Sequence, residues 1–242
     1  MLNRLYVVGI GAGGYDGLTV GAAKRLEESE VIIGYTVYCE LIKPYFPNKE
    51  YVSTAMTCET DRCRIALSLA AEGKKAALIC SGDAGVYGMA SPAIELAGEY
   101  GVEVECIPGV TAACSCAALL GSPVTSDFCV ISLSDLLTPA ETVEKRVRAA
   151  AESGICTVIY NPASKKRAGH LKRACEIFLE YRAPETVCGV VRNAGREGES
   201  KETMTLRELA GYKADMFTTV FIGNGDTRII NGKMVTLRGY KR

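Results

Sequence analysis

The sequence predicts an α/β protein of two lobes, the first with a mostly parallel sheet and the second with a mixed sheet. In the first half, apolar runs typical of buried strands alternate with amphipathic patterns typical of helices, which favours a parallel sheet covered on both faces. In the C-terminal part, short strand patterns and Asn-Gly turns favour antiparallel additions. Turn motifs at strand ends in both halves predict a ligand cleft between the lobes.

The first half contains four strand patterns and three helix patterns. A glycine at position 73 gives one of the helices a clear stop signal. The strands are expected at 5–11, 30–35, 74–81 and 102–109, and the helices at 18–29, 60–73 and 86–101.

The second half has one helix with an especially clear start. Thr138 is its expected N-cap, Pro139 its first residue and Glu141 the partner in a capping box, so the helix is expected at 138–154. A second helix is expected at 165–182, with strands at 127–134, 155–162, 185–194, 202–206, 217–224, 227–232 and 233–240. We place the domain boundary near 121–126, which gives lobes of residues 1–121 and 122–242.

Composition narrows the class of partner. The chain has 242 residues, nearly half of them apolar, and a net charge of zero. A nucleic-acid partner is disfavoured, because proteins that bind a phosphate backbone usually carry a basic excess. The uncharged run at 106–126 contains prolines and glycines, so a membrane helix is not expected there. With no secretory signal pattern at the N-terminus, we expect a cytoplasmic protein with no membrane partner.

The eleven cysteines raise the question of a metal centre. An iron–sulfur site is the more specific hypothesis, but the sequence contains no C-x-x-C motif. The closest spacings are Cys58 with Cys63 and Cys114 with Cys116. We therefore predict reduced thiols that serve as small core residues, and no protein-bound metal.

The first glycine loop, "GIGAGG", matches the dinucleotide fingerprint G-x-G-x-x-G between a strand and a helix. That fingerprint also needs an acidic residue at the end of the second strand, where this chain has Gly34 and Tyr35. A nicotinamide cofactor is therefore disfavoured, and the loop is either a tight turn or part of another ligand site.

The stretch "CSGDAGVYG" places Asp83 directly after a predicted buried strand, between Gly82 and Gly85. At the carboxyl end of a parallel strand, a carboxylate faces the ligand crevice and can bind a ribose hydroxyl pair or an ammonium group. The alternative is a helix N-cap. Similar turn motifs end other strands, at 107–113, 158–167 and 221–227.

Taken together, these motifs resemble the tetrapyrrole methylases, S-adenosylmethionine-dependent enzymes of corrinoid and sirohaem synthesis. The resemblance rests on "SGDAGVYGM", "PGVTA", "DFCVISLSDLLTP", "YNPASKKR", "VVRNAGREG" and "TLRGY", and it spans essentially the whole chain. It is greatest for the branch that methylates C17 of a corrinoid precursor in cobalamin synthesis and contracts the ring. It implies a homodimer that binds S-adenosylmethionine between two lobes and takes precorrin-3B or cobalt-factor III as substrate, with S-adenosylhomocysteine as product.

The resemblance also implies residue roles. The expected donor contacts are Gly82, Asp83, Val86, Tyr87, Thr111, Ala112, Tyr160, Asn161, Gly223, Asn224 and Thr227. The expected substrate contacts are Gly9, Gly11 and Gly13 at the edge of the macrocycle trough, with Arg62, Lys166, Arg192 and Arg196 for its carboxylates. The candidates for proton transfer during ring contraction are Asp127, Ser132, Asp135 and Thr138, for which capping and loop bonding are the alternative.

The chain departs from the family pattern at three places. It has Ala12-Gly13 where relatives have Pro-Gly, Ser126 where they have histidine, and Ala140 where many have tryptophan. The only histidine, His170, lies on a basic helical face and is expected to be solvated. The alternative functions are a Rossmann oxidoreductase, another tetrapyrrole methylase step, and a tetrapyrrole carrier that needs no donor pocket.

Overall fold

A computed structural model describes residues 3–164 and 169–240 of the chain. Residue contacts divide it into two compact units, Met1–Ala112 and Ala113–Arg242, here called the first and second unit. Within the described residues, every helix is too short or too polar to cross a lipid bilayer.

The first unit contains a five-stranded sheet in the order β3-β2-β4-β1-β5, in which every paired strand is parallel. Its central strands are buried on both faces, as expected for a parallel sheet between helices. The strands are β1 (Asn3–Gly9), β2 (Val31–Tyr35), β3 (Glu50–Thr54), β4 (Ala76–Cys80) and β5 (Val102–Ile107).

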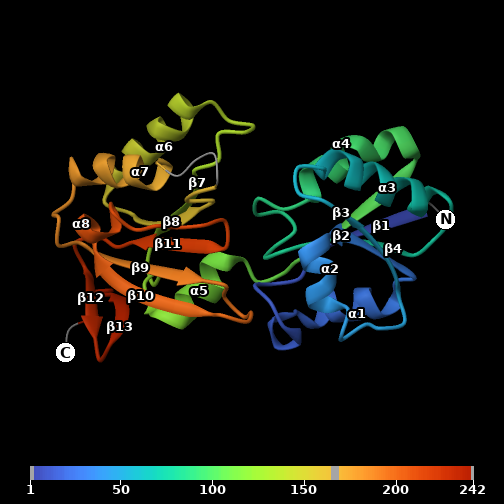
Figure 1. The fold of residues 1–242 in the computed structure, drawn as a ribbon, viewed down its shortest axis with the longest axis horizontal. Coiled ribbons are helices and arrows are strands. Elements are labelled where there is room, and N and C mark those ends of the chain that lie inside the picture. The colour runs from blue at the N-terminus through green and yellow to red at the C-terminus, as the bar shows by residue number, and fades with distance from the viewer. Residues whose placement is uncertain (1–2, 165–168, 241–242) are drawn as a thin grey trace. The chain divides into compact units, whose positions relative to one another are not determined.

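Helices cover both faces of this sheet (Figure 1). Helices α3 (Glu59–Ala71) and α4 (Ala90–Tyr100) pack on one face, where Leu5, Val7 and Leu78 point. Helices α1 (Val20–Glu28) and α2 (Thr36–Ile42) pack on the other, where Val8 and Ile79 point, and a 3₁₀ turn at Tyr15–Gly17 precedes α1. Because β1 and β4 are neighbours whose following helices go to opposite faces, their carboxyl ends form the switch point where α/β sheets bind ligands.

The second unit contains a mixed five-stranded sheet in the order β10-β9-β11-β8-β7. Only β7 and β8 are paired in parallel among its described strands, and β11 runs antiparallel to both β8 and β9. The strands are β7 (Phe128–Ser132), β8 (Cys156–Tyr160), β9 (Val187–Arg192), β10 (Ser200–Thr205) and β11 (Thr218–Ile222).

Two layers enclose the mixed sheet (Figure 1). Helices α6 (Ala140–Ser153), α7 (His170–Leu179) and the short α8 (Leu206–Leu209) form one core with the face that carries Val190 and Val220. Helix α5 (Ala112–Leu120) lies against the other face, next to a small sheet of β6 (Gly121–Ser122), β12 (Thr227–Ile230) and β13 (Lys233–Thr236).

The boundary between the units falls after Ala112, the first residue of α5, whereas the sequence placed it after that segment, at 121/122. Helix α5 belongs to the second unit because its residues bond and pack there. Lys201 donates from Nζ to the backbone oxygen of Leu119 at 2.6 Å. Leu120 fills the space above Gly189, where a Cβ atom would lie 2.6 Å from its Cδ1 atom.

Several element boundaries differ from the sequence expectations. Helix α6 begins at Ala140 with Pro139 as its N-cap, and no side-chain cap from Thr138 is present among the described residues. Helix α4 begins at Ala90, because the preceding glycine-rich turn is not helical. Strand β3 and helices α2 and α8 were not predicted, since they are short and their apolar periodicity is weak.

The packing of α5 on β9 can be tested at Gly189. In Gly189→Ala the new methyl group would meet Leu120 at 2.6 Å and the sulfur of Met234 at 2.9 Å, so these side chains must shift. We expect the free energy of unfolding to fall by about 1–3 kcal/mol in urea titrations. The double variant with Leu120→Ala should recover part of the loss, and strictly additive effects would contradict this packing.

Candidate functional site

Three backbone segments meet at the carboxyl ends of β1, β4 and β5. A Cβ atom on Gly109 would lie 2.1 Å from the backbone oxygen of Gly82 and 2.5 Å from that of Gly9, so only glycine fits. Gly82 has a positive φ of 68° and exchanges two backbone hydrogen bonds with Gly11, at 3.0 and 2.7 Å. We call these four residues the glycine knot. It occupies the switch point of the first unit.

The Asp83 carboxylate ties two of these segments together. Its Oδ1 atom accepts from the backbone N–H groups of Gly85 at 2.8 Å and Val86 at 3.2 Å, and its Oδ2 atom accepts from that of Gly109 at 3.0 Å. Met89 is the N-cap residue of α4, so Asp83 does not cap this helix. A carboxylate can accept about four hydrogen bonds, which leaves Asp83 able to accept roughly one more from a ligand.

The loop that Asp83 begins presents apolar side chains to the surface. Val86 is 37% exposed and Tyr87 is 59% exposed. Tyr87 has a positive φ of 53°, an uncommon conformation for a large side chain, so the loop is held in one particular shape. Thr111 and Ala112 pass within 3.6 Å of the position that a Cβ atom of Gly82 would take. The structure thus brings together the residues of 82–87 and 111–112 that were predicted to bind the donor.

In the second unit, another group of predicted residues gathers at one edge of the sheet, which here means the row of strand ends where β7 and β8 finish. The hydroxyl of Tyr160 accepts from the backbone N–H of Ala113 at 2.6 Å. Asn161 follows β8 with a positive φ of 51° and donates from Nδ2 to the hydroxyl oxygen of Ser132 at 2.9 Å. Ser132, Tyr160 and Asn161 therefore form one polar cluster at the carboxyl ends of the parallel strands β7 and β8.

Gly223, Asn224 and Thr227 lie at the opposite edge of this sheet, which corrects the prediction that they join Tyr160 and Asn161. Because β11 is antiparallel to β8, its last residue, Ile222, pairs with Thr157 near the start of β8. A five-residue strand spans about 14 Å, so the two groups are separated by about that distance.

The polar groups at that opposite edge anchor the small sheet. The Thr227 hydroxyl lies 2.9 Å from the hydroxyl of Thr236, which in turn donates to the backbone oxygen of Pro123 at 2.6 Å. Asn224 donates its backbone N–H to the Thr227 hydroxyl at 2.9 Å. These bonds give Asn224 and Thr227 a structural role.

The edge that carries Tyr160 also carries Asn193, which was not among the predicted site residues. Asn193 follows β9 with a positive φ of 51°, the same value as Asn161 after β8, and donates its backbone N–H to Phe217 at 3.1 Å. The sequence did carry a signal for this position. An asparagine follows both β8 and β9, two strands that run in the same direction on either side of β11, and asparagine tolerates this left-handed conformation.

The predicted cationic residues have different environments. Arg192 donates from Nε to Asp215 at 2.7 Å, and the Arg196 guanidinium lies 5.6 Å from the ring centre of Phe217. Both are at the Asn193 edge of the sheet, where a role toward substrate carboxylates stays a prediction. Arg62 is only 4% exposed and bonds to neutral groups, so its predicted role as a fork for substrate is wrong. Lys166 lies outside the described residues.

The candidate proton-transfer residues are not all together. Asp127 precedes β7, whereas Ser132 ends it, so these two lie at opposite ends of the strand. Asp135 lies 3.7 Å from Nε2 of His170, whose Nδ1 atom is 3.0 Å from the backbone oxygen of Leu133. His170 is therefore a half-buried, paired side chain, which corrects the expectation that it is solvated.

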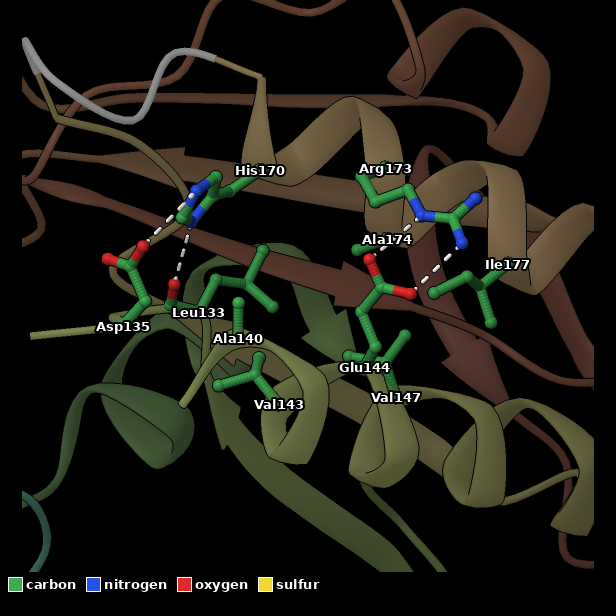
Figure 2. A pocket seen from close by; sticks show the side chains of 10 residues that line it. All are labelled: Leu133, Asp135, Ala140, Val143, Glu144, Val147, His170, Arg173, Ala174 and Ile177. Carbon is green, nitrogen blue, oxygen red and sulfur yellow. Dashed lines mark hydrogen bonds and ion pairs between the residues drawn. The ribbon is translucent and has the colours of Figure 1, made fainter. Parts of the chain in front are cut away.

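The pair of Asp135 and His170 forms one end of a pocket between α6 and α7 (Figure 2). At the other end, Arg173 makes two hydrogen bonds of 3.0 Å to Glu144. The apolar wall between these pairs belongs to the core of the second unit. The pocket is thus lined by core side chains and is bounded at its two ends by the pairs Asp135–His170 and Glu144–Arg173.

All eleven cysteines are free thiols. Burial raises the pKa of Cys80, next to the glycine knot, to about 11, so this thiol stays protonated near neutral pH. Within residues 3–164 and 169–240, no group of three or more histidine, cysteine or acidic side chains is arranged to hold a metal ion.

The comparisons with known proteins agree with this geometry. The family described as Tetrapyrrole (Corrin/Porphyrin) Methylases matches residues 4–210. The chain belongs to this family. A solved structure described as the methyltransferase CobJ has a TM-score of 0.89 and 35% identity, over 97% of this chain and 100% of that one. The predicted fold class and family are confirmed.

Curated relatives extend the match to nearly the whole chain. A probable cobalt-factor III C(17)-methyltransferase of Salmonella typhimurium is 43% identical over 98% of this chain and 99% of the relative. A cobalt-factor III methyltransferase of Priestia megaterium is 43% identical over 100% of this chain, which spans only 46% of that relative. A precorrin-3B C(17)-methyltransferase of a Sinorhizobium species is 37% identical, over 95% and 92% of the two chains.

Asp215 gives a pH-dependent test of the Asn193 edge. Burial alone would raise the pKa of its carboxyl group, but hydrogen bonds from Thr218, Arg192 and Phe217 outweigh burial and lower the pKa. A lowered pKa stabilises the fold above the unfolded value of about 3.9, and this stabilisation is lost as the pH falls through the folded value.

We therefore expect Asp215→Asn to lower the free energy of unfolding at pH 7 by no more than about 1 kcal/mol, since the group is partly exposed. The difference from wild type should shrink below about pH 4. Urea titrations at a series of pH values measure it, and an equal difference at pH 3 and pH 7 would show that the carboxylate charge is unimportant.

Proposed function

We propose that this chain transfers a methyl group from S-adenosylmethionine to C17 of precorrin-3B or cobalt-factor III, with contraction of the macrocycle. The observation that carries the proposal is the glycine knot with its Asp83 tie, at the switch point of a chain that matches C17-methyltransferases over nearly its full length. A tetrapyrrole carrier does not bind a methyl donor and would not need these closely packed loops, so the glycine knot favours a methyltransferase over a carrier.

The donor is proposed to bind the loops of the first unit at 82–87 and 108–112. There the absence of side chains on Gly82 and Gly109 lets the loops after β1, β4 and β5 pack backbone against backbone, so a donor at this place would meet loops of fixed shape. Asp83 is already fixed by three N–H groups, so it can accept from a ribose hydroxyl or an ammonium group without reorganising. Val86 and Tyr87 supply apolar contact.

In the second unit, Tyr160 and Asn161 remain proposed donor contacts. Asn193 and the backbone at 217–218 join them, because they lie at the same edge of the sheet. Tyr160 has a further role, since its hydroxyl holds Ala113 directly after the 111–112 segment. We no longer assign Gly223, Asn224 and Thr227 to the donor.

S-adenosylmethionine, when bound, supplies an electrophilic methyl group on a sulfonium centre. The residues of the chain need only align this group with the ring carbon and exclude water. Such alignment can lower a barrier by up to about 7–11 kcal/mol. No nucleophilic side chain has to form a bond to substrate, which is consistent with the buried, protonated thiol of Cys80.

Ring contraction is proposed to use groups at the Tyr160 edge. Ser132 and Asp135 lie there, and Asp135 is 3.7 Å from Nε2 of His170, so this imidazole is a further candidate beside it. Asp127 is set aside because it lies at the other end of β7, and Thr138 remains a proposal. A cytoplasmic homodimer also remains a proposal.

Turnover with defined macrocycles tests the function. The protein is incubated with S-adenosylmethionine and either precorrin-3B or cobalt-factor III, and the products are followed by mass and absorption spectra. We expect one methyl group to be added to one of the two substrates, with a spectral change from the shortened ring conjugation. A reaction without the donor is the control.

Two outcomes would contradict the proposal. Binding of a macrocycle without any affinity for S-adenosylhomocysteine in calorimetry would indicate a carrier. Methylation at a carbon other than C17, located by NMR of the product, would indicate another tetrapyrrole methylase step.

A further inference from the structure

Arg62 is a buried cation at the carboxyl edge of the first unit's sheet. It lies in the first turns of α3, is only 4% exposed, and is paired with no carboxylate among the described residues. Removing a guanidinium from water costs several kcal/mol, and an apolar residue often fills such a place with equal or better stability. This side chain is therefore expected to do something besides filling space.

The guanidinium joins two segments that follow different strands. Its Nε atom donates to the hydroxyl of Thr54 at 2.7 Å, and its Nη2 atom donates to the backbone oxygen of Ala55 at 2.8 Å. Its Nη1 atom lies 3.9 Å from the sulfur of Met89. The first two contacts are at the end of β3, and the third is at the end of the loop that Asp83 begins.

Both joined segments hold a residue in a strained backbone conformation. Thr57 has a φ of 67°, a genuine outlier for a β-branched residue, and Tyr87 has a φ of 53°. Such conformations cost about 1–3 kcal/mol each and persist only where the surrounding structure imposes them. Arg62 contacts both segments directly, so it can impose one shape on the two together.

We propose that Arg62 is a positioning residue that couples the 54–57 segment to the 84–89 segment and so sets the shape of the donor loop. The part of this inference that concerns the donor rests on the proposed function. It replaces the expectation that Arg62 binds a substrate carboxylate, because the guanidinium is already used inside the fold.

Two measurements on Arg62→Met test the coupling. Amide hydrogen exchange should become faster in both 54–57 and 84–89, whereas exchange in β9 of the second unit should stay as in wild type. Calorimetry with S-adenosylhomocysteine should show an affinity about tenfold weaker, which corresponds to one lost polar contact. Arg64→Met is the matched control, because Arg64 is an exposed arginine of the same helix, paired with Asp61, and should change neither readout.

The outcomes separate this inference from the proposed function. Faster exchange in 54–57 alone, or unchanged affinity in a folded Arg62→Met protein, would overturn the positioning role. If wild type itself fails to bind S-adenosylhomocysteine, the proposed function fails, and the exchange data still decide the coupling. If Arg62→Met does not fold, Arg62→Lys serves instead, since lysine keeps the charge but cannot reach three partners, and it should give the same pattern to a smaller degree.

Discussion

The hydrogen bonds from three backbone N–H groups to one carboxylate are the interaction on which the candidate site depends. Asp83 connects the loop after β4 to the loop after β5, while Gly82 bonds to Gly11 in the loop after β1. Without the carboxylate, the exposed N–H groups of Gly85 and Val86 could bond to water, whereas the partly buried N–H of Gly109 would need another partner, at a cost of about 1–3 kcal/mol if it stayed unbonded. One side chain therefore ties the loops after β4 and β5 together at the switch point of the sheet, and backbone bonds add the loop after β1.

The same arrangement explains why glycine is required at the centre. The backbones of Gly9, Gly82 and Gly109 touch, and a methyl group at Gly109 would overlap two backbone oxygens. The loops after β1, β4 and β5 are therefore in direct backbone contact. Arg62 adds hydrogen bonds from α3 to Thr54 and Ala55 at the end of β3. The loops at 82–87 and 108–112, to which we assign the donor, are thus held by contacts within the first unit.

Much of this was predictable from the sequence, and the misses have physical causes. The parallel first sheet and the mixed second sheet followed from apolar patterns, and the place of Asp83 in the turn after β4 followed from a carboxylate between glycines at a strand end. The direction of β11 could not be predicted, because a strand has the same periodicity in both directions, and this misplaced Gly223, Asn224 and Thr227. The burial of Arg62 was also hidden, since its partners are neutral groups after β3 and α3 has a weak apolar period. The boundary at the start of α5 depends on contacts with β9 that local sequence does not show.

The most direct test of the central claim compares Asp83→Ala and Asp83→Asn with wild type in calorimetric titrations with S-adenosylhomocysteine. Exposed Asp61→Ala is the control. Asparagine keeps one accepting oxygen for the tie and alanine keeps none, so we expect alanine to weaken binding by about 1–3 kcal/mol and asparagine by less. If folded Asp83→Ala binds as tightly as wild type, the carboxylate does not organise the donor site and the account is contradicted.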